Sequence, residues 1–184
     1  KQRLGEVLQV GTRRALAEAM VTDVLIALRR TRGLDGVLVV SGDETATALA
    51  SGYDALDVIT DRDDSGHNDA AMLGLRAARE RGADRALLVP GDVPALDPAE
   101  LSNLLTRATS GPEVVIVPDR HGDGTNGLLL TGPDVIVPAF GPGSRARHAD
   151  LAAAAGARCE VFDVPSLALD VDTGQDLATL VDRL

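Results

Sequence analysis

Short apolar runs alternate with segments of helical spacing along this chain, and this alternation limits the fold more than any other feature of the sequence. Residues 37–41 and 86–90 are mainly apolar, and each run is followed directly by a glycine and an aspartate, which is typical of buried strands. Apolar residues recur at helical spacing in residues 12–30 and 68–81. Such alternation favours right-handed crossovers and a mostly parallel sheet with helices on both faces.

The pattern continues along the rest of the chain, with no repeat and no linker that divides it. Residues 114–118 and 127–131 are close enough in sequence to form a hairpin-like insertion, so we expect a mixed sheet. Because the chain has 184 residues and 45% of them are hydrophobic, we expect a single domain over residues 1–184. Further strands are predicted at residues 57–60 and 159–164, and further helices at residues 44–51, 98–109, 145–155 and 174–184.

The chain carries a net charge of -10. Such a charge repels polyanions, and the sequence offers no basic stripe to neutralise a phosphate backbone, so we expect no nucleic-acid partner. Anionic small substrates require local compensation from divalent cations, backbone amides or a few arginines. These groups are therefore the ones to look for.

Cys159 is the single cysteine and cannot form an intramolecular disulfide. The sequence shows no charged-then-apolar leader and no apolar run of membrane-spanning length. We therefore expect a cytoplasmic protein that does not associate with a membrane. The sequence leaves open whether the chain forms a homo-oligomer.

Asp92 lies just past the predicted strand 86–90, where ligands bind in open α/β sheets. Aspartates at such positions often cap a turn or a helix. Here Asp97, Pro98 and Glu100 are predicted to supply the N-cap, the first helical residue and the capping-box glutamate of the next helix. Asp92 is then left for another role, and a carboxylate at a strand end suits a hard cation that bridges phosphate oxygens.

The segment LDVDT places Asp170 and Asp172 on the same side of an extended chain. Asp172 or Thr173 can cap the last helix, with Gln175 or Asp176 completing the capping box. Asp170 is then predicted as the second metal ligand, although both aspartates are also compatible with caps or solvated side chains. Two carboxylates that come from distant strand ends and converge on Mg²⁺ are a more specific sign of a metal site than either motif alone.

Two glycine-rich turns are the predicted anion-binding elements. GDGTNG contains Thr125, and FGPGS contains Gly141 and Ser144 directly before a helix. Hydroxyls and exposed amides at a helix N-terminus bind phosphate or carboxylate groups, and Arg145 and Arg147 are candidates for charge-assisted bonds. The alternative is that these are ordinary turns and that Ser144 is the N-cap of its helix.

The segment SGHNDA ends a polar loop and begins a helix at Asn68. This residue is predicted either to hold the base or ribose of a nucleotide or to cap the helix. His67, His121 and His148 lack the spacing of zinc ligands and are interpreted as surface histidines.

Several of these segments together resemble one enzyme family. The segments LLVPGDVPALDPAEL, SGHNDA, TNGLLL, FGPGSRARH and LDVDT are similar to parts of the guanylyltransferases that use 2-phospho-L-lactate or phosphoenolpyruvate in coenzyme F420 biosynthesis. The similarity spans nearly the whole chain. It implies a single-domain, three-layer α/β/α nucleotidyltransferase fold that is Rossmann-like, with a mixed, mostly parallel sheet.

The resemblance also implies roles for individual residues. Asp92 and Asp170 would bind Mg²⁺, and GTP would be the donor, with Gly66 and Asn68 near the nucleoside. Family members carry an N-terminal strand and a basic loop, of which KQRLG looks like the tail, so Lys1 and Arg3 would face the triphosphate. The phosphorylated acid would be held by Thr125, Gly141 and Ser144.

Two alternatives remain at this point. One is a guanylyltransferase for another acceptor, such as the molybdenum cofactor or a sugar phosphate. The other is a non-catalytic nucleotide-binding module. The richness in arginine and alanine indicates a high-GC bacterium, in which phosphoenolpyruvate is the usual acceptor of the family.

Overall fold

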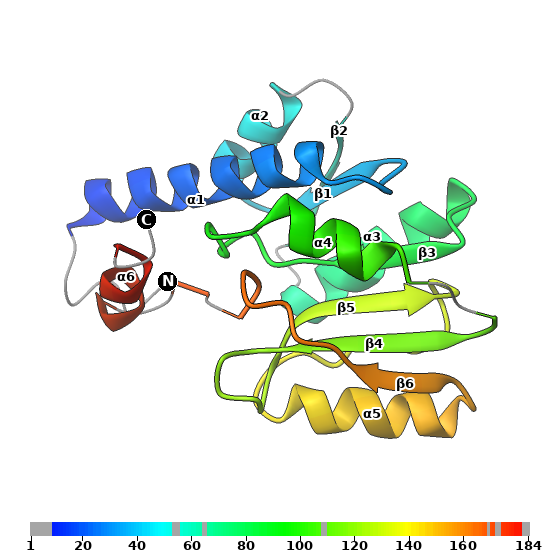
Figure 1. Cartoon of the computed structure of the whole chain (residues 1–184). Coiled ribbons are helices and arrows are strands. Elements are labelled where there is room, and N and C mark those ends of the chain that lie inside the picture. The colour runs from blue at the N-terminus through cyan, green and yellow to red at the C-terminus, as the bar shows by residue number, and fades with distance from the viewer. Residues whose placement is uncertain are drawn as a thin grey trace.

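A computed structural model of the chain describes residues 9–52, 56–63, 66–107, 110–168, 170–171 and 174–181. Helices and strands alternate over most of this length, as the sequence predicts (Figure 1). The helices are α1 (Val10–Arg30), α2 (Glu44–Ser51), α3 (His67–Glu80), α4 (Pro98–Leu105), α5 (Ser144–Ala154) and α6 (Gly174–Val181). The strands are β1 (Val37–Ser41), β2 (Leu56–Thr60), β3 (Arg85–Leu88), β4 (Glu113–Pro118), β5 (Thr125–Thr131) and β6 (Arg158–Val161).

The described strands form two sheets. Strands β1 and β2 pair in parallel, with Val37 opposite Leu56. The larger sheet has the order β3-β5-β4-β6, in which β5 is antiparallel to both of its neighbours and β4 is parallel to β6. The predicted pairing of residues 114–118 with residues 127–131 is confirmed. Parallel and antiparallel pairing thus occur together, as expected for a mixed sheet.

Both faces of the larger sheet are covered, because alternate residues of its central strands enter different cores. Val115 and Leu129 pack with residues of α1 and α4, such as Val24 and Leu104. Their sequence neighbours on β4 and β5 pack on the opposite side against residues of α3 and α5, in a cluster that contains Leu75, Val114, Ile116, Leu128, Leu130 and Ala152. This is the three-layer arrangement that the resemblance implies.

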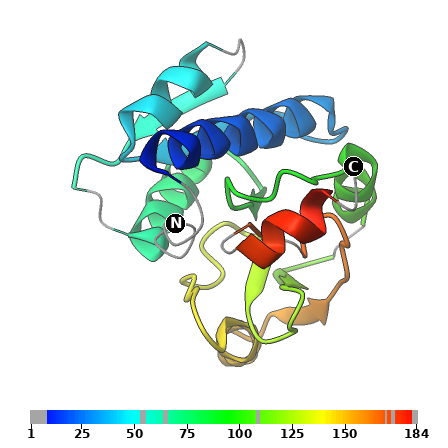
Figure 2. The same cartoon turned by 90° about the vertical axis from the view of Figure 1, so that its left-hand side faces the viewer.

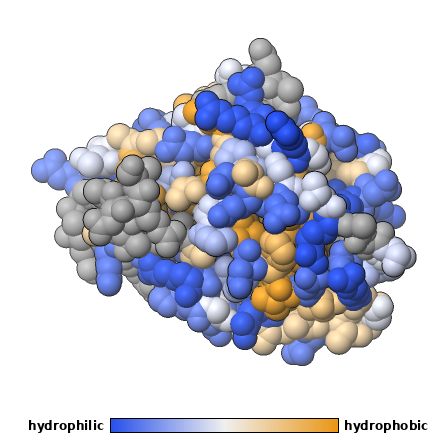
Figure 3. All heavy atoms as spheres, in the orientation of Figure 1, coloured by the Kyte–Doolittle hydropathy of each residue, from blue (hydrophilic) through white to orange (hydrophobic). Residues whose placement is uncertain are grey.

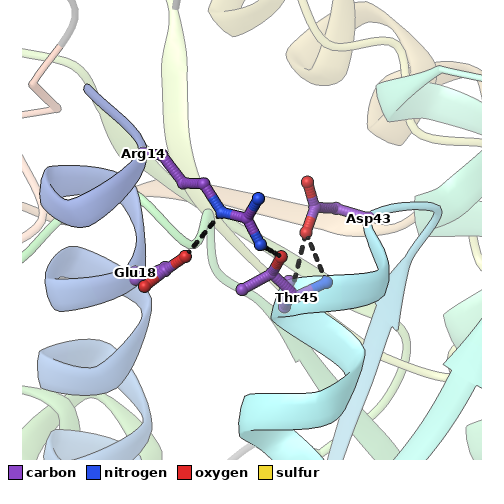
Figure 4. A network of polar contacts seen from close by, with 5 residues as sticks. Arg14, Glu18, Asp43 and Thr45 are labelled. Carbon is purple, nitrogen blue, oxygen red and sulfur yellow. Dashed lines mark hydrogen bonds and ion pairs between the residues drawn. The ribbon is translucent and has the colours of Figure 1, made fainter. Parts of the chain in front are cut away.

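Helix α1 connects several parts of the molecule. Near its N-terminal end, Arg14 donates hydrogen bonds to Glu18 one turn later (2.9 Å) and to the Thr45 hydroxyl of α2 (2.7 Å) (Figure 4). Asp43 caps α2 by accepting from the backbone N–H groups of Thr45 and Ala46. Further along α1, Met20 packs with Val171 and with Leu180 of α6, and Figure 2 shows α6 lying next to α1.

The predicted cap of α4 is confirmed only in part. Asp97 accepts a hydrogen bond from the Ala99 N–H (2.7 Å), and Pro98 is the first helical residue. The Glu100 carboxylate does not close a capping box, because it accepts from the backbone N–H of Ser166 instead (2.9 Å). Glu100 therefore joins α4 to the segment that leads to Asp170.

The surface of the molecule is mostly hydrophilic on the face of Figure 1, with a group of hydrophobic residues near its middle (Figure 3). Among the residues that the structure describes, no helix is both long and apolar enough to span a membrane.

Candidate active site

A cavity of about 460 Å³ lies where the segments after β3 and before α6 meet the beginning of β5 and the loop before α5. Four of the predicted site residues line it: Asp92, Thr125, Gly141 and Asp170. They come from widely separated parts of the chain, so their convergence is a property of the fold. The remaining lining residues are His67, Pro90, Gly91, Asn126 and Phe140.

The two aspartate segments are joined through their backbones. The Val171 N–H donates a hydrogen bond to the Asp92 carbonyl oxygen (3.1 Å). Each aspartate precedes a fully buried valine, since Val93 and Val171 are both inaccessible to solvent. The buried valines anchor the two segments in the core, and this fixes the backbones from which both carboxylates enter the cavity.

Asn126 connects β5 to the second aspartate. Its Nδ2 group donates to the Leu167 carbonyl (2.9 Å) and, in a longer contact, to the Asp170 carboxylate (3.5 Å). Asn126 therefore orients a carboxylate that the sequence assigned to metal binding. Asn126 was not among the predicted site residues, although it lies next to Thr125 in the TNG segment.

Thr125 is held by a histidine that is completely buried. The Thr125 Oγ1 atom lies 3.0 Å from Nδ1 of His148, and the backbone N–H of Ala139 donates to His148 Nε2 (2.9 Å). Burial is the main cause that lowers the His148 pKa to about 4, and the positive charge of Arg147 acts in the same direction. The interpretation of His148 as a surface histidine is therefore wrong, because the ring is 0% exposed.

Asn68 binds the backbone of the loop before α5. Its Oδ1 atom accepts from the Phe140 N–H (2.7 Å), and its Nδ2 group makes a long contact with the Phe140 carbonyl (3.5 Å). Helix α3 begins at His67 with Gly66 as its N-cap, so the alternative in which Asn68 caps the helix is wrong. Gly66 and Asn68 are absent from the residues that line the described cavity.

Ser144 is the first residue of α5, and its N-cap is Gly143, which has a positive φ of 70°. The prediction of Ser144 as the cap is therefore wrong. The Ser144 side chain is buried, and its hydroxyl has no hydrogen-bond partner among the described residues. It does not line the cavity, although its N–H donates to the carbonyl of Gly141, which does (3.0 Å).

Arg147 binds the loop that precedes its own helix. Its guanidinium donates to the carbonyl oxygens of Ala139 (2.9 Å), Phe140 (3.3 Å) and Pro142. The structure thus gives Arg147 a role in holding this loop, whereas the sequence offered it as a substrate contact.

His67 and Phe140 extend the site beyond the predicted residues. Their rings are 4.6 Å apart in an edge-to-face arrangement, and both line the cavity. Burial lowers the His67 pKa, while the charge of Asp92 acts in the opposite direction. His67 and Phe140 were not predicted as site residues, because nothing in their local segments indicates this contact.

Lys1, Arg3, Asp172 and Thr173 lie outside the described residues, so the predictions for them stay predictions. Among the described residues, no group of three or more His, Cys, Asp or Glu side chains is arranged to hold a metal ion. Asp92 and Asp170 are thus a pair of carboxylates, and an ion bound by them needs further ligands from substrate or water.

The fold has counterparts among solved nucleotidyltransferases. A nucleotidyl transferase from Methanothermobacter thermautotrophicus superimposes with a TM-score of 0.66 at 25% identity, covering 91% of this chain and 79% of the other. A 4-diphosphocytidyl-2C-methyl-D-erythritol synthase gives a TM-score of 0.65 at 16% identity, with 88% and 86% covered, which supports the fold alone.

Sequence similarity identifies the family. Residues 1–182 match the family described as "Guanylyl transferase CofC like", and the chain belongs to this family. A phosphoenolpyruvate guanylyltransferase of Conexibacter woesei is 54% identical over 98% of this chain and 81% of its own length. A 2-phospho-L-lactate guanylyltransferase of Methanothermobacter thermautotrophicus is 37% identical over 98% of this chain and 78% of its own length.

Proposed function

We propose that this protein transfers GMP from GTP to phosphoenolpyruvate, with release of pyrophosphate, as a cytoplasmic enzyme of coenzyme F420 biosynthesis. The observation that carries the proposal is the cavity itself, in which Asp92 and Asp170 share one space with Thr125 and Gly141. The 54% identity to a phosphoenolpyruvate guanylyltransferase favours that acceptor. 2-Phospho-L-lactate is the second candidate, because a relative named for it is 37% identical.

The residues present fit a magnesium ion. Two carboxylates that line one cavity, with no third acidic or histidine ligand in the described residues, suit an ion that keeps several waters and binds substrate phosphates. When bound, Mg²⁺ would neutralise charge on the reacting phosphates. Asp92 and Asp170 would hold it, and Asn126 would keep the Asp170 carboxylate in place.

The acceptor is assigned to the part of the cavity that is lined by Thr125 and Gly141. Thr125 and Gly141 would bind its phosphate or carboxylate oxygens, and Ser144 would contribute from outside the cavity by holding the Gly141 carbonyl through its N–H (3.0 Å). The phosphate oxygen of the acid would attack the α-phosphorus of GTP in line, and the bond to pyrophosphate would break. Little proton transfer is needed, so catalysis depends on positioning and charge.

The nucleoside is assigned to the side of α3. The side chain of Asn68 is bonded to Phe140, so its contact with the nucleotide would come from the backbone N–H at the helix N-terminus, next to Gly66. Lys1 and Arg3 are proposed to face the triphosphate.

The test measures pyrophosphate release by the full-length protein with GTP and Mg²⁺. Phosphoenolpyruvate, 2-phospho-L-lactate and 3-phosphoglycerate are supplied separately. We expect release with phosphoenolpyruvate and none with 3-phosphoglycerate, which serves as the control acid. Pyrophosphate release with 2-phospho-L-lactate but not with phosphoenolpyruvate would reassign the acceptor. No release with any of the three acids would reject the proposed reaction.

The metal assignment is tested by Asp92→Asn, which keeps the size of the side chain and removes its charge. We expect the turnover number to fall by roughly a thousandfold or more, because metal stabilisation of the transition state is lost. Turnover within tenfold of the parent enzyme would remove Asp92 from the reaction centre.

A further inference from the structure

The bonds of His148 define which of its nitrogens carries a proton. The backbone N–H of Ala139 can only donate, so His148 Nε2 must accept with a lone pair (2.9 Å). A neutral ring has one proton, which then resides on Nδ1 and points at Thr125 Oγ1 (3.0 Å). The burial that lowers the His148 pKa to about 4 keeps the ring neutral near pH 7.

This arrangement fixes the polarity of the Thr125 hydroxyl. Its oxygen accepts from His148, so its own hydrogen must be directed elsewhere. No acceptor for this hydrogen occurs among the described residues, and Thr125 lines the cavity. The hydroxyl therefore presents a donor to whatever occupies the cavity.

The loop before α5 likewise has carbonyl oxygens that are already bonded and an N–H group that can still donate. The carbonyl oxygens of residues 139, 140 and 142 accept from the Arg147 guanidinium, and the carbonyl of Gly141 accepts from the Ser144 N–H. By contrast, the N–H of Gly141 has no partner among the described residues. We call the cavity-lining residues Thr125 and Gly141 the donor wall, because the Thr125 hydroxyl and the Gly141 N–H can still donate, whereas the Gly141 carbonyl is already bonded.

We propose that His148 is a positioning residue that directs the Thr125 hydrogen into the cavity and thereby makes the donor wall selective for unprotonated phosphate or carboxylate oxygens. A substrate that places a neutral hydroxyl at the same position gains less binding free energy, because a hydrogen bond to a charged oxygen is stronger than one to a neutral group. The identity of the bound acid rests on the proposed function, whereas the orientation of Thr125 does not.

The two bonds of His148 can be separated with a matched pair of amide substitutions. His148→Asn places an N–H near the position of Nδ1 and can still donate to Thr125, but it does not reach Ala139. His148→Gln reaches the position of Nε2 and can accept from Ala139, but it does not donate to Thr125. Each variant loses one hydrogen bond, so their effects on stability should be similar.

Steady-state kinetics of the full-length protein distinguish the two bonds. We expect His148→Gln and Thr125→Val each to raise the KM for phosphoenolpyruvate roughly tenfold, while the KM for GTP stays within about twofold. The conservative variants His148→Asn and Thr125→Ser keep the donor to the cavity and should raise the KM for phosphoenolpyruvate less than His148→Gln and Thr125→Val do. In the double variant Thr125→Val with His148→Gln, the acceptor KM should not exceed that of Thr125→Val alone.

Three results would overturn the proposal. The first is a KM for phosphoenolpyruvate that is raised by His148→Asn but not by His148→Gln. The second is an equal rise in the KM values for phosphoenolpyruvate and GTP in His148→Gln or Thr125→Val. The third is a double variant in which the two effects on the KM for phosphoenolpyruvate multiply. Ile116→Val is the control for general destabilisation, since Ile116 is fully buried and does not line the cavity. It should lower stability by about 1 kcal/mol and leave both KM values unchanged.

A second measurement needs no substrate. Long-range ¹H–¹⁵N spectra of protein labelled at its histidines report the tautomer of each ring, and the spectrum of His148→Gln assigns the signal. We expect the Nδ1-protonated tautomer from about pH 6 to about pH 8. An Nε2-protonated ring would refute the proposal. If this tautomer is found and no acid releases pyrophosphate, the proposed function fails while the orientation of Thr125 stands.

Discussion

At the scale of single residues, the polar side chains around the cavity mostly bind the backbone of another segment. Asn68 binds Phe140, Asn126 binds Leu167, and His148 binds Ala139. A buried polar group that loses such a partner costs about 1–3 kcal/mol. The fully buried His148 therefore holds the geometry of the site and also stabilises the protein, whereas the exposed Asn68 mainly positions the Phe140 backbone.

The buried histidine makes stability depend on pH. The His148 pKa is lowered from 6.5 to about 4 on folding. Between these values the unfolded chain binds more protons than the folded one, so stability falls as the pH drops from about 6.5 to about 4. The total contribution is on the order of 3 kcal/mol.

Urea unfolding at several pH values between 7.5 and 4.5 (roughly the window set by these two pKa values) measures this effect. His148→Gln should lose stability at neutral pH and show a shallower decline toward acid. His121→Gln, at an exposed histidine, is the control and should keep the slope of the parent. Parallel curves for the parent and His148→Gln would contradict the prediction.

At the scale of elements, the boundaries that carry a local signal are predicted best. Strand β1 and helix α2 are found at the predicted residues, because Gly42 ends the strand and Asp43 caps the helix. Helix α4 ends at Leu105, whereas the prediction extended it further, since the residues that directly follow contain no glycine or proline to end it. The start of α5 was misassigned because a glycine, Gly143, is its N-cap in place of the expected serine.

Two glycines with positive φ, one before and one after α5, allow the effect of backbone strain to be distinguished from an effect on substrate binding. Gly141 has a φ of 112° and lines the cavity, whereas Gly156 has a φ of 65° and open space around it. Replacing either by alanine should cost roughly 1–2 kcal/mol, because L-residues rarely adopt these conformations. Only Gly141→Ala should also raise the acceptor KM.

Thermal unfolding and the two KM values measure this contrast. Gly156→Ala is the matched control, and its KM values should equal those of the parent. A Gly141→Ala enzyme with an unchanged acceptor KM would show that the Gly141 backbone takes no part in binding the acid.

At the scale of the whole molecule, the cavity joins chain segments that are far apart in sequence. The strand-end aspartates and Thr125 were found from the sequence because each belongs to a local motif. Asn126, Phe140 and His148 were not, because their roles arise from contacts with other segments. Ser144 and His148 are one helical turn apart and both buried, and this spacing was the available sign of a shared inner face.

Binding at such a cavity should stabilise the entire fold. Ligands that bind the folded state alone raise the free energy of unfolding, by about 2.7 kcal/mol at a concentration one hundred times Kd. We expect Mg²⁺ with GTP to raise the midpoint of thermal unfolding in the parent. Asp170→Asn should abolish most of this rise because it removes a proposed metal ligand.

Scanning calorimetry with and without Mg²⁺ and GTP provides the measurement. Asp163→Asn, at an exposed aspartate outside the cavity, is the control and should respond like the parent. The same midpoint rise in Asp170→Asn and in the parent would exclude Asp170 from the metal site.

The backbone bond from Val171 to Asp92 has a consequence for the order in which the protein becomes active during synthesis. The ribosome makes β3 and Asp92 before the segment that contains Asp170 and Val171. That segment follows β6 and is therefore translated much later. A nascent chain can thus bury much of the larger sheet before the two proposed metal ligands are brought together. Premature termination between the two aspartates would release a product with one carboxylate and no partner, which we expect to be catalytically silent.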